Sequence, residues 1–100
     1  MKTRINGLPA IHPGEFLRET LDELGLSQAA FAEALCISPM RVSHLLKGVR
    51  PVTAELALRM GIALGQTPEY WLNLQTSYDL KMAQAEMKDS LRLVRALALA

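Results

Sequence analysis

The residues best suited to chemistry lie close together, between positions 38 and 50. Their side chains donate hydrogen bonds, carry positive charge or contact methyl groups: Ser38, Met40, Arg41, Ser43, His44, Lys47 and Arg50. Arginine, serine and histidine match the donors and acceptors that base edges present in the major groove of DNA, and methionine can contact a thymine methyl group. These residue types therefore suggest recognition of double-stranded DNA, although a solvated helix face would contain similar residues.

Residues with catalytic or metal-binding potential form no recognisable site. His12, His44 and Cys36 could be proposed as metal ligands, but their spacing matches no zinc pattern. Cys36 has no neighbouring base or oxyanion donor in the sequence, so a small buried thiol is the better interpretation. No pair of carboxylates and no glycine-rich phosphate loop suggests an enzyme. We therefore expect no catalytic activity, no metal and no cofactor.

Tyr70 and Trp71 could form a stacking platform for single-stranded nucleic acid. Aromatic side chains at helical spacing are more often part of a core, and we place Trp71 there. Asn73 and Gln75 could contact a partner protein, but exposed amides on a helix need no such explanation, so neither is assigned a role.

Composition indicates one small all-α domain. The chain has 100 residues, of which 50% are hydrophobic but only 5% aromatic, so aliphatic side chains suited to helix packing must build the core. A single cysteine, no signal peptide and no long apolar run favour a soluble protein of the reducing cytoplasm, away from the membrane. The net charge is +1, but acidic residues dominate positions 15–33 and basic residues dominate positions 41–59.

Cap signals divide the first half of the chain into three helices. Pro13 begins a helix that Gly25 ends, and Ser27 caps a second helix over residues 28–35. After the turn at residues 36–38, Ser38 caps a third helix over residues 39–47, with Gly48 behind it. The inward positions are predicted from their spacing, and they are Phe16, Leu17, Leu21, Leu24, Phe31, Leu35, Val42, Leu45 and Leu46.

The second half contains two or three more helices. Thr53 caps one that ends at Gly65, Thr67 and Pro68 begin the next, and a final helix is expected from about Ser77. We thus expect an N-terminal arm over residues 1–11, a helix-turn-helix domain over residues 12–76 and a C-terminal helix over residues 77–100. An apolar stripe in that last helix is either a dimer seam or a side packed on the core; it contains Leu80, Ala83, Met87, Leu91, Val94 and Leu97.

Two short helices joined by a tight turn are the means by which many proteins place one helix in the major groove. The helix over residues 39–47 presents Met40, Arg41, Ser43 and His44 outward, as base contacts. Gln28 begins the first of the two helices, and Lys47 and Arg50 follow the second at its far end, so these three residues suit phosphate contacts on either side. Ser38, the cap of the second helix, is also expected to contact DNA.

Several segments carry a family resemblance. Residues 26–38 (LSQAAFAEALCIS) and 42–48 (VSHLLKG) resemble the XRE-type, or lambda-repressor-like, helix-turn-helix. Residues 12–17 (HPGEFL), 48–53 (GVRPVT), 70–75 (YWLNLQ) and 78–80 (YDL) are similar to the HigA/VapI group of antitoxins. The resemblance covers residue 11 to about residue 80. Cys36 departs from the family pattern, which usually has glycine there, so the turn is expected to be slightly strained or reshaped.

The resemblance implies a homodimer that binds a palindromic operator in its own promoter and silences a RelE-like ribonuclease toxin. Two alternatives remain open on the sequence: a stand-alone regulator of the same fold without a toxin partner, and an interaction module that has lost DNA binding. A toxin reading frame beside this one would distinguish the first hypothesis from the second.

Overall fold

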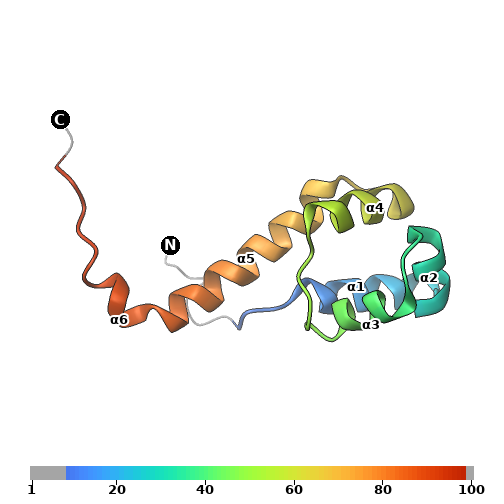
Figure 1. Ribbon diagram of the computed structural model, residues 1–100, viewed down its shortest axis with the longest axis horizontal. Coiled ribbons are helices and arrows are strands. Elements are labelled where there is room, and N and C mark those ends of the chain that lie inside the picture. The colour runs from blue at the N-terminus through green and yellow to red at the C-terminus, as the bar shows by residue number, and fades with distance from the viewer. Residues whose placement is uncertain (1–8, 99–100) are drawn as a thin grey trace.

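The computed structural model describes residues 9–98, so the greater part of the expected N-terminal arm lies outside the described residues. Within this range the chain forms helices and no strand (Figure 1). The predicted all-α class is therefore confirmed. The helices are α1 (Pro13–Leu24), α2 (Gln28–Leu35), α3 (Pro39–Leu46), α4 (Ala54–Leu64), α5 (Pro68–Glu86) and α6 (Lys88–Leu91).

The predicted capping residues set the helix starts. The side chains of Ser27, Ser38 and Thr53 accept hydrogen bonds from backbone N–H groups in the first turns of α2, α3 and α4. Each bond satisfies a donor that the helix itself leaves free. Gly25 and Gly65 end α1 and α4 in the left-handed conformation, as predicted. Local side-chain chemistry thus fixes where these helices begin and end.

The core lies where α1 to α5 converge. Its buried aliphatic and aromatic side chains come from all five helices and the loop after α3: Leu17, Leu21, Phe31, Ala32, Leu35, Val42, Leu45, Leu46, Val52, Leu56, Ala57, Met60 and Trp71. Trp71 is fully buried, and its Nε1–H donates to Gln66 Oε1 at 2.7 Å, so its assignment to the core is confirmed. Leu24 was expected on the inner side of α1 but is exposed, because α1 ends at that turn and no other described residue covers its last position.

Gly14 allows α1 to approach α3 closely. A Cβ atom at this position would collide with the backbone carbonyl of Leu45. The absence of a side chain therefore brings the start of α1 against the C-terminal half of α3. Arg18, one turn later, donates from Nη2 to the Leu46 carbonyl at 3.4 Å, which satisfies an otherwise free acceptor at the end of α3.

The C-terminal part differs from the prediction. No new helix begins near Ser77, because α5 continues through this position to Glu86. Only α6 follows, and residues 92–98 are not helical. A serine can cap a helix, but here the backbone already has helical partners on both sides of it. Of the helix expected over residues 77–100, the described part (77–98) thus consists of the second half of α5, the short α6 and a non-helical tail over residues 92–98.

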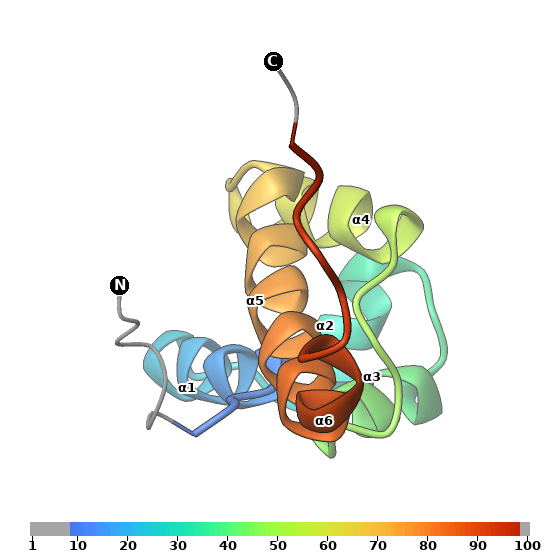
Figure 2. The ribbon, with the colours of Figure 1, turned by 90° about the vertical axis from the view of Figure 1, so that its left-hand side faces the viewer.

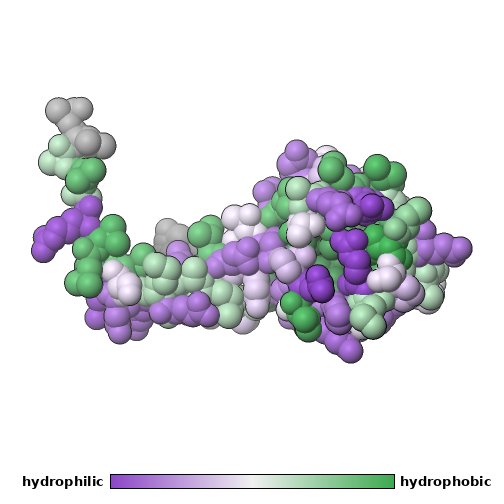
Figure 3. All heavy atoms as spheres, viewed as in Figure 1, coloured by the Kyte–Doolittle hydropathy of each residue, from purple (hydrophilic) through white to green (hydrophobic). Residues whose placement is uncertain are grey.

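This C-terminal part projects away from the body of the molecule (Figures 1 and 2). With the projection included, the molecule measures 52 × 28 × 22 Å. The apolar stripe therefore does not pack on the core: Leu80, Met87, Leu91, Val94 and Leu97 are all exposed. Hydrophobic side chains are visible along this extension (Figure 3). Among residues 9–98, no helix combines the length and apolar character that spanning a membrane would require.

Candidate DNA-binding interface

The α3 helix has one buried face and one open face. Val42, Leu45 and Leu46 are buried, whereas Met40 and Lys47 are exposed and Ser43 and His44 are half-buried. At 3.6 residues per turn, Met40, His44 and Lys47 lie on one side, opposite the core. Ser43 and Arg41 lie on the two flanks. The structure thus brings the sequence-predicted base contacts together on α3 in a position open to a ligand.

The turn before α3 orients this helix. Ser38 Oγ accepts the backbone N–H of Arg41 at 3.2 Å, which leaves its hydroxyl hydrogen free to donate to a phosphate. Cys36 adopts φ 58° and ψ 43°, so this non-glycine residue occupies the left-handed region that the family pattern usually fills with glycine. Its thiol is exposed, and the expectation of a buried thiol is wrong. Cys36 follows the last residue of α2 as its C-cap and is not among the buried core residues.

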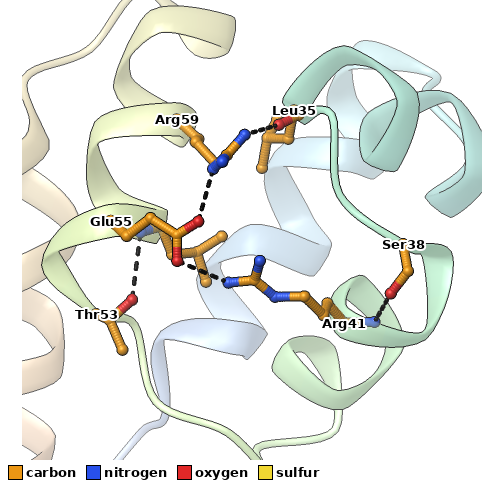
Figure 4. Close-up of polar contacts among 7 residues, drawn as sticks. Leu35, Ser38, Arg41, Thr53, Glu55 and Arg59 are labelled. Atoms are coloured by element: carbon orange, nitrogen blue, oxygen red, sulfur yellow. Dashed lines mark hydrogen bonds and ion pairs between the residues drawn. The ribbon is translucent and has the colours of Figure 1, made fainter.

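Arg41 is joined to α4 rather than extended into solvent. Its Nη2 lies 3.3 Å from Glu55 Oε1, and the other carboxylate oxygen, Oε2, accepts from Arg59 Nε at 2.9 Å. Arg59 Nη1 in turn donates to the carbonyl of Leu35, the last residue of α2, at 2.8 Å. Glu55 therefore lies between two guanidinium groups, as Figure 4 shows. The two hydrogen bonds, first that of Arg41 and then that of Arg59, lower the pKa of the Glu55 carboxyl group.

The loop between α3 and α4 carries Arg50, which is exposed beside Arg41. Both arginines line a hollow of about 70 Å³ together with Thr53, the residue that caps α4. The remaining positions lie at helix ends: Gln28 is the exposed first residue of α2, and Lys47 is the exposed residue after the last turn of α3. The predicted phosphate-contacting residues thus come from separate elements around α3.

His12 holds this loop from the other side. Its Nδ1 accepts the backbone N–H of Gly14 at 2.9 Å, its ring lies edge-on to Tyr78 of α5 with centroids 5.0 Å apart, and Gly48 passes close to the ring. Burial lowers the pKa of the His12 imidazole, while a hydrogen bond to the Arg50 backbone and nearby carboxylates oppose this shift. His12 therefore has a structural role as the N-cap of α1.

Gln75 is a second positioning residue that the sequence left unassigned. Its buried amide accepts the backbone N–H of Val52 through Oε1 at 2.8 Å and donates to Asp79 Oδ1 at 2.9 Å. It thereby ties the loop after α3 to α5. Glu55 and Arg59 were likewise not singled out. Their i, i+4 spacing predicts their own pairing, but no sequence signal joins either residue to Arg41.

Comparison with known proteins places this geometry in a family. A helix-turn-helix family model matches residues 17–72, more than half of the chain. Virulence-associated protein I of Dichelobacter nodosus is 47% identical over 90 residues, which cover 89% of this chain and 82% of that protein. An addiction module antidote protein of the HigA family from Coxiella burnetii is 41% identical with a TM-score of 0.88, over 90% of this chain and 100% of the other. The chain belongs to the HigA/VapI group of helix-turn-helix proteins.

One HigA structure includes DNA. Antitoxin HigA of Pseudomonas aeruginosa, solved with the higBA promoter, is 35% identical to this chain with a TM-score of 0.84, and the match covers 91% of this chain and all of the other. Within the present HigA-type chain the helix-turn-helix model ends at Leu72, so most of α5 and all of α6 lie beyond it. The likeness to the two solved HigA structures extends over most of these residues.

Proposed function

We propose that this protein is a sequence-specific DNA-binding antitoxin that represses its own operon and neutralises a RelE-like ribonuclease toxin. The DNA-binding part rests on the open face of α3. This face carries Met40, Ser43, His44 and Lys47, and the opposite side of the helix is buried in the core. The similarity to an antitoxin solved with promoter DNA supports the same assignment.

The roles divide between base edges and phosphates. Arg41, Ser43 and His44 read base edges by hydrogen bonds, and Met40 contacts a thymine methyl group. The phosphate contacts come from the surrounding helix ends and loop, and they are made by Gln28, Ser38, Lys47 and Arg50. Such contacts set the register of α3 along the groove without reading the sequence.

We infer that the protein binds its operator as a homodimer. A two-fold dimer would place the two copies of α3 about 34 Å apart, which is one turn of the duplex and matches a palindromic site. The exposed apolar side chains of α5, α6 and the tail supply a surface that a second copy would cover.

Toxin binding requires a surface separate from α3, and α1 with the N-terminal arm or the C-terminal part could supply it. The exposed side of α1 is acidic, with Glu15, Glu19, Asp22 and Glu23. Such a surface suits a ribonuclease, because proteins that bind RNA carry positive charge. Co-expression with the adjacent reading frame and a pull-down test this part, and a stand-alone regulator would capture no toxin.

Two substitutions in the α3 region test the DNA-binding part. Arg41→Ala removes a bidentate base contact, so operator affinity should fall by roughly 1–3 kcal/mol and the preference at one base position should flatten. Lys47→Ala removes a phosphate contact, so operator and scrambled duplex should weaken together, and the slope of log affinity against log salt should fall by about one unit.

A salt titration against both duplexes measures these effects. Both variants should remain folded, since the buried residues Val42, Leu45 and Leu46 are unchanged. If Arg41→Ala leaves the operator and scrambled affinities as they were, α3 is not the reading helix and the proposed function is wrong.

A further inference from the structure

We propose that Glu55 is a specificity-determining residue of the DNA interface, which positions the Arg41 guanidinium for base contact and withholds it from phosphates. The inference rests on the proposed reading role of Arg41. Glu55 is not on α3, and its side chain carries the charge that DNA repels. Its contact with Arg41 is what gives it a part in recognition.

The arrangement around Glu55 is a continuous chain of charged hydrogen bonds from the end of α2 to the reading helix. It runs from the Leu35 carbonyl through Arg59 and the Glu55 carboxylate to Arg41, with heavy-atom distances of 2.8, 2.9 and 3.3 Å (Figure 4). Thr53 caps the same turn of α4. The first turn of α4, which carries Glu55, is thus fixed by its cap, and the carboxylate is held through Oε2 by Arg59 while Oε1 accepts from Arg41.

This chain is poorly placed to stabilise the fold. The Glu55 side chain is 55% exposed and the two arginine side chains are each 38% exposed, so water screens both ion pairs. Exposed pairs of this kind contribute little to folding. The neighbouring arginines lower the pKa of the Glu55 carboxyl group further, so the side chain is charged at neutral pH. A charge maintained beside a DNA-reading arginine at little benefit to stability therefore points to a role in binding.

The chemistry of guanidinium explains that role. Arginine has five N–H donors, and the contact with Glu55 Oε1 uses one of the two hydrogens on Nη2, so the second Nη2 hydrogen and its neighbour on the other edge of the guanidinium remain free for a base edge. Because the pair fixes the rotamer, less side-chain entropy is lost on binding. A freely moving Arg41 would also bind phosphates on any duplex, and the nearby carboxylate opposes this. Glu55 should therefore lower affinity for random DNA more than for the operator.

Glu55→Gln tests the proposal, because it removes the charge and keeps the size of the side chain. Affinities for operator and scrambled duplexes are measured across a salt titration by fluorescence anisotropy. We expect scrambled-duplex affinity to rise, its log–log salt slope to steepen by about one unit, and the operator-to-scrambled ratio to fall about tenfold. An unchanged ratio overturns the proposal.

Three further variants separate positioning from general electrostatics. Glu69→Gln makes the same charge change on the exposed start of α5, away from Arg41, and should leave the ratio unchanged. Glu55→Asp keeps the charge but shortens the side chain, so its ratio should fall towards that of Glu55→Gln; a wild-type ratio would show that charge alone acts. In an Arg41→Ala background, Glu55→Gln should have little further effect on the ratio.

Additive effects in that double variant would contradict a role through Arg41. Melting temperatures should stay near the wild-type value for all of these variants, because the pair is exposed. A wild-type protein that shows no preference for its operator over scrambled DNA would instead disprove the proposed function, so the two failures are distinguishable.

Discussion

At the scale of single residues, type and spacing predict which side chains face outward on α3 but not what each one contacts. Met40 and Lys47 are exposed, as the pattern of apolar positions requires. Arg41 is predicted on the same face, yet it pairs with Glu55 from another helix. Such a contact depends on the angle between α3 and α4, and a sequence pattern contains no information about that angle.

Cys36 stands where the family pattern usually has glycine, and the resulting backbone strain could be anticipated from the sequence. Because a Cβ atom is disfavoured at φ 58°, Cys36→Gly should relieve strain of about 1–2 kcal/mol, partly offset by the larger entropy that glycine loses on folding. We expect a net gain of roughly 0.5–1 kcal/mol in unfolding free energy, measured by urea denaturation. Cys36→Ala is the matched control, since it removes the thiol and keeps the Cβ atom. Equal stabilisation by both substitutions would show that the thiol, and not the backbone, carries the strain.

At the scale of elements, the helix starts were predictable because capping is local. Ser27, Ser38 and Thr53 each bond an N–H three residues ahead, a relation that the sequence displays directly. The continuation of α5 through Ser77 could not be predicted in this way, because the sequence does not distinguish a serine within a helix from a serine that caps one. The links between elements were missed for the same reason as the Arg41 pair: Gln75 and His12 each join segments that are distant along the chain.

His12 makes stability depend on pH. Because its pKa is lowered in the folded state, the folded chain binds fewer protons than the unfolded chain between the two pKa values. The His12 contribution is therefore fully present above about pH 6.5, the unfolded value, and is lost as the pH falls through the folded value. We expect the melting temperature to decrease between pH 7.5 and pH 5, measured by circular dichroism.

The matched variants are His12→Asn and His44→Asn. Asparagine can still cap α1 but does not titrate, so His12→Asn should flatten this pH dependence. It should also lower stability at pH 7.5 by about 1 kcal/mol, because the ring contact with Tyr78 is lost. His44→Asn removes the other histidine and should retain the wild-type slope. A wild-type slope in His12→Asn would assign the pH dependence to other groups.

At the scale of the whole molecule, the sequence left two interpretations of the C-terminal stripe, and the fold removes one of them. A stripe packed on the core would be buried, but Val94 is 72% exposed and Leu97 is 79% exposed. The direction in which α5 leaves the body follows from its packing against α4 and α1, and α5 is longer than the side of the body it covers (Figure 1). Exposed apolar residues gathered on one projecting segment favour a partner surface, and a second copy of the chain is the proposed occupant.

Truncation after Glu86 tests whether a second copy of the chain binds the C-terminal part, and it leaves α1 to α5 intact. The contacts of α5 with the rest of the fold involve His12 with Tyr78, and Gln75 with Val52, and both pairs remain. The truncation removes exposed Met87, Leu91, Val94 and Leu97, so sedimentation velocity at micromolar concentration should show a shift from dimer to monomer. Operator affinity should fall at least tenfold, because the two half-sites would no longer be bound by one linked pair of α3 helices.

A second apolar surface supplies the control for this truncation. Ile62 on α4 is 86% exposed, and Leu58 lies one turn before it on the same helix. Ile62→Ser should leave the dimer intact if residues 87–98 form the seam, since it changes a separate surface. The opposite result, a stable dimer after truncation and a monomer with Ile62→Ser, would place the seam on α4. In that case the exposed side chains of α6 and the tail would remain free for a different partner, and the acidic side of α1 would not be the sole candidate surface for a toxin.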